Sequence, residues 1–293
     1  MISVLIPVYN YNILNLVKDI HDQLMESGIN FEILCLEDGS NRQNTEQNKE
    51  ITSFKNTSQL ILETNIGRSS ARQLLCTKAK YNWLLFLDAD VKAKTSEYIS
   101  TYLKFINLKY EAVFGGFAYL PEKPKDNHVL RWAYGKSKEE TPASIRNKNP
   151  YKVIISANFL IKKPVFHSIN SQIKGNSYGF DNFFGSLLKS NNIKLFHIDN
   201  EVYHLGLETS TCYLSKIETA VETLLNLYQS GKIENHSNEL LLVFLKLKKY
   251  RLNYLAILVY KLINPILKKQ LLSSKPSIKL LQLYKICYMC NLE

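Results

Sequence analysis

The chain has 293 residues, of which 45% are hydrophobic and 22% charged, with 11 glycines and 8 prolines. This composition excludes a disordered or fibrous protein, and the length fits one large α/β domain or one domain with an appendage. The formal net charge is +11, but residues 240–293 hold ten basic side chains and one acid, so the first 239 residues are nearly neutral, with 27 basic and 25 acidic side chains.

Strands and helices are predicted to alternate over residues 2–117. Apolar runs rich in β-branched and aromatic residues predict strands at 2–8, 31–36, 59–62, 83–87 and 112–117. Helical spacing and turn residues predict helices at 13–24, 44–55, 67–80 and 96–108. This alternation is typical of an α/β fold with a mostly parallel sheet, covered by helices on both faces and built from right-handed crossovers.

The segment at residues 121–150 differs in character from the alternating part. It is polar and charged, and prolines interrupt it. We predict a long mobile loop beside a site here, with regular structure resuming at residues 152–161.

Polar residues follow the first four predicted strands. They are Asn10, Asp38, Asn65, and the pair Asp88 and Asp90. Ligands of such sheets bind beyond the carboxyl ends of the strands, so we expect these side chains to converge on one rim. The sequence therefore predicts a binding site along this edge.

Motifs of several enzyme classes are missing from the sequence. It contains no phosphate-binding P-loop, no dinucleotide-binding glycine fingerprint and no zinc-protease HExxH helix. It does contain Asp88-Ala89-Asp90 at the end of an apolar strand. Two carboxylates placed there can hold a divalent cation whose remaining ligands are water and a substrate diphosphate.

Four motifs occur in a fixed order over the first ~90 residues. They are Ile6-Pro7-Val8-Tyr9-Asn10, Glu37-Asp38-Gly39-Ser40, Asn65-Ile66-Gly67-Arg68-Ser69-Ser70-Ala71-Arg72 and Asp88-Ala89-Asp90. This arrangement resembles the family 2 glycosyltransferases, and a looser likeness extends to about residue 210. The resemblance implies a Rossmann-like GT-A fold and an inverting enzyme that transfers a sugar from a nucleotide-sugar donor.

The same resemblance implies which residues bind the donor nucleotide. Pro7, Tyr9 and Asp38 would line the base and ribose, with Asp38 accepting a hydrogen bond from the base N3–H. The family often has two acids where this chain has Glu37 and Asp38. Pro7 also fits a simple strand end, and that alternative stays open.

The diphosphate and the metal are implied to lie beside the later motifs. Arg68 and Arg72 fall where the family packs near the diphosphate, Asp88 would touch the ribose, and Asp90 would bind Mn²⁺ or Mg²⁺. His204, in a segment similar to the one that ends the family core, would ligate the cation or contact the leaving phosphate. Arg72 also fits a surface arginine, and His204 a structural histidine.

An acceptor hydroxyl must lose its proton during an inverting transfer, so a base is required. Relatives commonly carry a Glu-Asp pair at a helix start where this chain has Phe180 and Asp181. Asp181 is therefore the expected base, and its alternative is a helix N-cap. Residues 156–158 lie where relatives shape the acceptor pocket.

Three other functions remain open from the sequence. Gly67-Arg68-Ser69-Ser70-Ala71 nearly matches the nucleophile turn of serine hydrolases, although that function leaves Asp38 and the paired aspartates unexplained. A sugar nucleotidyltransferase would have a glycine-rich loop where residues 9–12 stand. A catalytically inactive relative could act as a membrane-surface scaffold, since one acid beside Asp181 is missing.

The C-terminal region is predicted to be helical and separate from the catalytic part. We predict a GT-A-type catalytic domain at residues 1–210 and a basic region at 211–293. No apolar run in residues 240–293 spans a bilayer, and the basic, Leu- and Tyr-rich pattern suits an anionic membrane surface, a protein partner, or lysines that only face water. Nucleic-acid binding is not favoured, because the body is not basic.

Cysteine usage bears on the compartment. Five scattered cysteines and the absence of a charged leader favour a cytoplasmic protein, peripheral at most on the inner membrane face. Cys287 and Cys290 have redox or zinc spacing, but they are expected to be ordinary buried thiols. The predicted reaction moves a hexose or N-acetylhexosamine, from a UDP-linked donor, to a hydroxyl on a glycan or lipid-linked acceptor.

Overall fold

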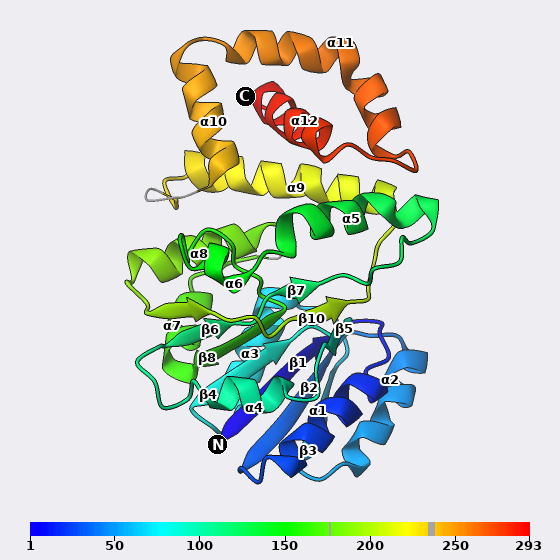
Figure 1. Cartoon of the computed structure of the whole chain (residues 1–293), viewed down its shortest axis with the longest axis vertical. Helices are drawn as coiled ribbons and strands as arrows, with labels where there is room; N and C mark the ends of the chain where they lie inside the picture. Colours follow the sequence, from blue (N-terminus) through cyan, green and yellow to red (C-terminus); the bar gives the residue numbers. More distant parts are fainter. Residues whose placement is uncertain (176, 234–237) are drawn as a thin grey trace.

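The computed structural model describes residues 1–175, 177–233 and 238–293. Its main sheet has seven strands in the order β3-β2-β1-β4-β8-β6-β9 (Figure 1). The strands are β1 Ile2–Val8, β2 Phe31–Asp38, β3 Thr57–Leu62, β4 Trp83–Leu87, β6 Ala112–Phe114, β8 Asn158–Lys162 and β9 Leu195–His197. Strand β8 alone runs antiparallel to its neighbours in this sheet, which confirms the mostly parallel α/β fold.

Helices cover both faces of this sheet, because the central strands are apolar on both sides. Strand β1 directs Ile2, Val4, Ile6 and Val8 to one core, whereas Leu5 belongs to the opposite one. The first core packs α1 Leu14–Glu26, α4 Tyr98–Leu103 and the 3₁₀ turn η1 Lys49–Ser53, which follows α2 Arg42–Asn48. The second packs α3 Arg68–Lys78, α7 Lys163–Asn170 and α8 Phe180–Ser190.

A second, three-stranded sheet extends the edge where the predicted site lies. It consists of β5 Val91–Ala93, β10 Val202–His204 and β7 Phe117–Ala118, in that order. The strand predicted at 112–117 is divided between the two sheets at Gly115 and Gly116. A Cβ at Gly115 would lie 2.4 Å from the Asn200 carbonyl oxygen, and Gly116 has a φ of +90°, so only glycines permit this bend.

The prediction of a mobile loop at 121–150 is wrong. The segment contains η2 Asp126–His128, α5 Val129–Tyr134, a π-helical turn at Gly135–Glu139 and α6 Ala143–Arg146. Arg146 is buried and donates to the carbonyl oxygens of Phe114 at 3.2 Å and Ile198 at 2.8 Å. A polar segment is ordered here because its arginine satisfies backbone acceptors at the end of the sheet. The structure expected to resume at residue 152 begins only with β8 at Asn158.

Arg146 also fixes the state of a buried histidine that no sequence motif indicates. The Arg146 Nη1 lies 2.9 Å from His197 Nδ1, and the Pro150 carbonyl oxygen lies 2.7 Å from His197 Nε2. Because an arginine only donates and a carbonyl only accepts, Nδ1 accepts and Nε2 carries the proton. Burial lowers the pKa of His197 to about 4, and the charge of Arg146 acts in the same direction.

Because of His197, we expect the protein to become less stable in acid. Between pH 6.5 and 4 the unfolded chain binds a proton at His197 that the folded chain does not, so the free energy of unfolding falls as the pH falls. We expect this group to contribute a loss of about 2 kcal/mol between pH 7.5 and pH 5, measured by urea unfolding. His197→Gln should flatten the pH dependence, whereas the exposed His167→Gln should keep it. Equal pH dependence in wild type and His197→Gln would contradict this assignment.

Four helices follow the sheets and form a layer at one end of the molecule (Figure 1). They are α9 Ser210–Gln229, α10 Glu239–Lys249, α11 Asn253–Leu271 and α12 Ile278–Asn291, so the C-terminal region is helical as predicted. Tyr284 and Tyr288 of α12 donate to Glu218 and Glu222 of α9. Within the described residues, no helix combines the length and the apolar content that crossing a bilayer requires.

The cysteines of α12 behave as predicted. Cys287 and Cys290 are free and buried, and burial raises the pKa of the Cys290 thiol to about 11. In the part of the chain that the structure describes, no three Cys, His, Asp or Glu side chains gather as a metal-binding group. Cys290 is part of the apolar core that also contains Met289 of the same helix.

Candidate active site

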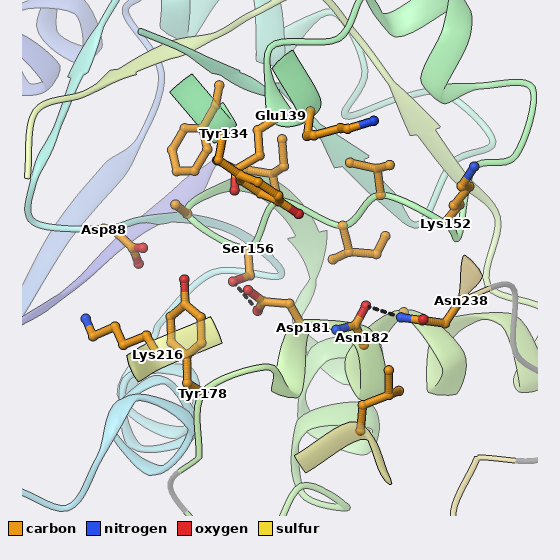
Figure 2. Close-up of a pocket in the computed structure, with 18 of the residues that line it drawn as sticks. Asp88, Tyr134, Glu139, Lys152, Ser156, Tyr178, Asp181, Asn182, Lys216 and Asn238 are labelled. Carbon is orange, nitrogen blue, oxygen red and sulfur yellow. Dashed lines mark hydrogen bonds between the residues drawn. The ribbon is translucent and has the colours of Figure 1, made fainter. Parts of the chain in front are cut away.

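A cavity of about 500 Å³ opens beyond the carboxyl end of β4. Its volume lies in the range of small-molecule sites. Five predicted site residues line it, from the start of α3, the β4–β5 turn, the start of α8 and the end of β10: Arg68, Asp88, Asp90, Asp181 and His204. Figure 2 shows the side chains of Asp88 and Asp181 directed toward the same space. The fold thus brings together site residues that are up to 136 positions apart in the sequence.

Asp88 is held by the two arginines of the first turns of α3. The Arg68 Nη2 donates to one carboxylate oxygen at 2.5 Å, and the Arg72 Nη2 donates to the other at 2.7 Å. Arg68 and Arg72 are four residues apart, so both side chains lie on the same face of the helix. The Arg68 side chain is partly exposed to the cavity, which leaves a cation available to an anionic ligand.

Arg72 is buried rather than exposed on the surface of α3. Its Nη2 also donates to the Ser156 carbonyl oxygen at 2.5 Å, and its guanidinium lies about 6 Å from the Phe86 and Phe159 ring centres. Burial, together with the charge of Arg68, lowers the pKa of Arg72 to about 10, so it is still charged at neutral pH. Arg72 therefore supports the site from behind the cavity wall.

Asp90 and His204 form the second polar pair of the cavity. The His204 Nε2 lies 3.2 Å from Asp90 Oδ2. Burial alone would raise the pKa of Asp90, but the hydrogen bond from His204 and the charges of His204 and Arg68 lower it. His204 Nδ1 is buried and has no hydrogen-bond partner in the described structure. The pair is brought together by pairing of β5 with β10, in which Val91 faces His204.

The Asp90 carboxylate fits a divalent cation that shares its ligands with a substrate. A Cβ at Gly206 would lie 2.0 Å from Asp90 Oδ2, so only a glycine lets the chain pack this closely against the carboxylate. One carboxylate oxygen and one imidazole nitrogen suit Mn²⁺, whereas Mg²⁺ would use mainly the carboxylate. Among the described residues no third acidic, histidine or cysteine ligand joins them, so water and diphosphate oxygens would complete the coordination.

Asp181 lies in the first turn of α8, on the other side of the cavity. Its Oδ1 accepts a 2.5 Å hydrogen bond from the Ser156 Oγ, and its Oδ2 lies 3.9 Å from Arg68 Nη1. The helix itself is preceded by Gly179, and its N-cap makes no side-chain hydrogen bond, so Asp181 does not act as the N-cap. Phe180 packs against the apolar core on the α3 side of the sheet.

The residues predicted to bind the base lie outside this cavity. Asp38 ends β2, and its carboxylate accepts from the backbone N–H of Ile66 at 2.7 Å and of Gly67 at 3.0 Å. Pro7 is half-buried in β1, and Tyr9 is exposed just after it. Asp38 therefore anchors the turn that precedes Arg68, and each of its oxygens has a further acceptor direction.

Several residues that line the cavity were not predicted from the sequence. Most come from the supposed loop and from α9: they are Arg131, Tyr134, Lys138, Glu139, Tyr178, Glu208 and Lys216. No motif indicates them, because they reach the cavity only through the packing of α5 and α9. Tyr178 could have been found by its place three residues before Asp181. Asn158, by contrast, is fully buried and bonds to Tyr98 and Tyr102, so it shapes the fold rather than the cavity surface.

The serine hydrolase alternative is not supported by the geometry. Ser69 does not line the large cavity, and in the described chain no hydrogen bond joins it to His204. The ring nitrogen of His204 that has a partner faces Asp90 instead. Ser69 and His204 therefore do not form the nucleophile–base pair that a serine hydrolase requires.

Residues 3–169 match the family described as Glycosyl transferase family 2, so the chain belongs to that family. No protein among the curated sequences matches significantly.

Solved structures share the fold at low identity. A fragment of S. aureus TarS, residues 1–349, superposes with a TM-score of 0.50 at 17% identity, covering 77% of this chain and 65% of the fragment. The same fragment has been solved in complex with UDP-GlcNAc. That structure matches at 16% identity and a TM-score of 0.51, covering 77% of this chain and 66% of the fragment. The mannosyltransferase PcManGT of Pyrobaculum calidifontis, solved with GDP-Man and Mn²⁺, matches at 11% identity, 78% and 64% coverage and a TM-score of 0.52. The chain thus spans slightly less than two thirds of the TarS fragment.

A further neighbour is mannosyl-3-phosphoglycerate synthase from Rubrobacter xylanophilus. It has a TM-score of 0.55 at 12% identity, with 82% of this chain and 77% of that chain covered. At such identities the likeness establishes the GT-A fold alone.

Proposed function

We propose that the protein is an inverting glycosyltransferase. It would move a hexosyl or N-acetylhexosaminyl group from a nucleoside diphosphate sugar, with UDP as the expected nucleotide, to a hydroxyl of a glycan or lipid-linked acceptor in polysaccharide biosynthesis. The observation that carries the proposal is the meeting of two groups in one cavity. Arg68, Asp90 and His204 suit a diphosphate with its cation, and Asp181, whose Oδ2 lies 3.9 Å from Arg68 Nη1, borders the same space as a base.

The donor nucleotide is proposed to bind along the carboxyl ends of β1 and β2. Pro7 and Tyr9 would contact the base and ribose, and Asp38 would accept from the base N3–H through its free acceptor direction. Asp88 would contact the ribose while keeping Arg68 and Arg72 in position. Arg68, which faces the cavity, would contact the diphosphate.

Asp90 and His204 are proposed to hold a divalent cation, Mn²⁺ or Mg²⁺, together with diphosphate oxygens. The bound cation would neutralise negative charge on the leaving group. The chain's own contribution is to place the Asp90 carboxylate and the His204 ring 3.2 Å apart beside the cavity, with Gly206 packed against the carboxylate.

Asp181 is proposed to act as the base. The acceptor hydroxyl oxygen would bond to the anomeric carbon as the bond from that carbon to the diphosphate oxygen breaks. The hydroxyl proton would pass to the Asp181 carboxylate, and the nucleoside diphosphate would leave with the bonding electrons. Ser156 orients the carboxylate through its 2.5 Å hydrogen bond. Attack from the face opposite the leaving group inverts the anomeric configuration.

The proposal places the enzyme in the cytoplasm. None of the five cysteines forms a disulfide, and four of them are buried, which fits a reducing compartment. Neither nucleic acid binding nor a nucleotidyltransferase reaction is part of the proposal, because the cavity offers paired acids rather than a glycine-rich phosphate loop.

The anomeric configuration of the product tests the proposal. Purified protein with Mn²⁺ and UDP-α-glucose, or UDP-α-N-acetylglucosamine, should slowly transfer the sugar to water. Proton NMR at early times should detect the β-anomer first. Early release of the α-anomer would contradict inversion, and no turnover of any sugar nucleotide, with or without added glycans, would favour the scaffold alternative.

A further inference from the structure

Helix α11 exposes an apolar face along most of its length. Leu255, Leu258, Leu262 and Ile266 are between 53% and 69% exposed, and Tyr254 beside them is 69% exposed. Their spacing places them on one side of the helix. In Figure 1, α11 lies at the outer edge of the molecule, beyond α12.

The opposite face of α11 is already packed. Leu267 and Leu271 are buried with Leu281 and Tyr284 of α12 in a separate apolar cluster. The inner face of the helix therefore provides its packing, and the outer face is not covered by any other part of the described structure. Leu242 and Val243 of α10 add to the exposed apolar surface of the same helical layer.

Basic side chains accompany this face, and acids are absent from it. Lys261, Lys269 and Arg251 are exposed, and they have no ion-pair partner among the described residues. Lys268 is different, because it pairs with Glu218 at 2.9 Å. Between residues 240 and 292 the sequence contains no aspartate or glutamate. The helix and the turn before it thus combine exposed apolar side chains with exposed basic ones.

We infer that the outer face of α11 docks on an anionic lipid bilayer. A helix with an apolar side, basic neighbours and an interfacial tyrosine lies in the headgroup region, where its apolar residues are buried and its lysines meet anionic lipids. The charge of this face favours an anionic lipid surface over a second copy of the chain. A second copy would oppose the same unpaired lysines to each other, whereas an anionic surface complements them. The inference does not depend on the proposed transferase reaction.

The position of α12 connects this surface with the active site. A second cavity, of about 580 Å³, shares Lys152, Asn182 and Asn238 with the first and reaches Gln282 and Lys285 of α12. Helix α12 therefore lies between the inner face of α11 and this second cavity.

Vesicle co-sedimentation of the full chain tests the docking. We expect binding to phosphatidylcholine vesicles that contain about 30% phosphatidylglycerol, and little binding to pure phosphatidylcholine. Leu258→Glu with Leu262→Glu should weaken the partition coefficient at least tenfold, because two exposed leucines no longer enter the bilayer. Lys261→Glu with Lys269→Glu should weaken it by at least about fivefold per residue and should reduce its salt dependence.

Met25→Glu, on the exposed side of α1, is the matched control and should leave binding unchanged. Circular dichroism and thermal unfolding of each variant, compared with wild type, separate loss of docking from loss of folding without relying on the proposed donor site. Equal binding to both kinds of vesicle, no binding to either, or self-association that disappears in the Leu258→Glu, Leu262→Glu variant would overturn the inference.

Discussion

Replacing Asp181 with asparagine is expected to lower kcat for sugar transfer about 10²–10⁴-fold, the usual contribution of a positioned base. The amide keeps the shape of the carboxylate, but it cannot take the proton of the acceptor hydroxyl. UDP binding should persist, because Asp181 contacts Arg68 only at 3.9 Å and is not in the Asp90 pair. The measurement is steady-state turnover of the sugar nucleotide, combined with calorimetric binding of UDP.

The matched control is Glu208→Gln. Glu208 lines the same cavity and pairs with Lys216, so the change also removes one carboxylate charge from the cavity. We expect its kcat to stay within a few-fold of wild type. Full activity of Asp181→Asn would remove Asp181 as the base, and Phe180 beside it offers no substitute.

Replacing Asp90 with alanine is expected to weaken Mn²⁺-dependent binding of UDP about 100-fold, in line with the several kcal/mol that a metal contributes at a phosphoryl oxygen. Asp90 is the carboxylate that faces His204, and no other acid lies within hydrogen-bond distance of that ring in the described structure. Binding measured with excess chelator should be as weak in wild type as in the variant.

Asp90→Ala and Asp181→Asn serve as controls for each other, because they should affect different steps. The first should lose metal-dependent binding, and the second should keep it while losing turnover. The Asp90–His204 pair is largely buried, with the His204 side chain 11% and the Asp90 side chain 28% exposed, so Asp90→Ala is expected to lower the melting temperature. Asp90→Asn, which keeps an oxygen acceptor for His204 but lacks the charge, is the control that separates loss of the cation from loss of folding. Metal-dependent UDP binding that survives in Asp90→Ala would contradict the assignment of the cation to this residue.

Local patterns were enough to predict the part of the fold that carries the family motifs. Strand β4 occupies residues 83–87, as predicted, because five consecutive apolar residues can only be buried there on both faces. The polar residues after the strands meet at one rim because parallel strands end on the same edge. Asp88 and Asp90 could therefore be placed at this rim from local patterns, whereas Asp181 was indicated only by the family resemblance.

Long-range packing could not be predicted from the sequence. Residues 121–150 look like a loop because their charges and prolines obscure helical spacing. Only the sheet end, with its free carbonyl oxygens, explains why Arg146 is buried. The cavity wall formed by α5 and α9 was missed for the same reason.

The substitution at Phe180 also has an explanation that the sequence alone does not supply. Phe180 lies with Phe166 and Phe184 in a small recess and packs against the apolar core on that side of the sheet. The cavity side of α8 begins at Asp181. Phe180 thus packs toward the core, whereas Asp181 lines the cavity.

The most direct test of the donor site is a calorimetric titration of the purified protein with UDP, GDP and dTDP, each with Mn²⁺ and again with excess chelator. We predict that UDP binds in the presence of Mn²⁺, that chelation weakens this binding strongly, and that GDP and dTDP bind more weakly. Absence of binding by all three nucleotides in the presence of Mn²⁺ would contradict a nucleotide-sugar site formed by Asp38, Arg68 and Asp90.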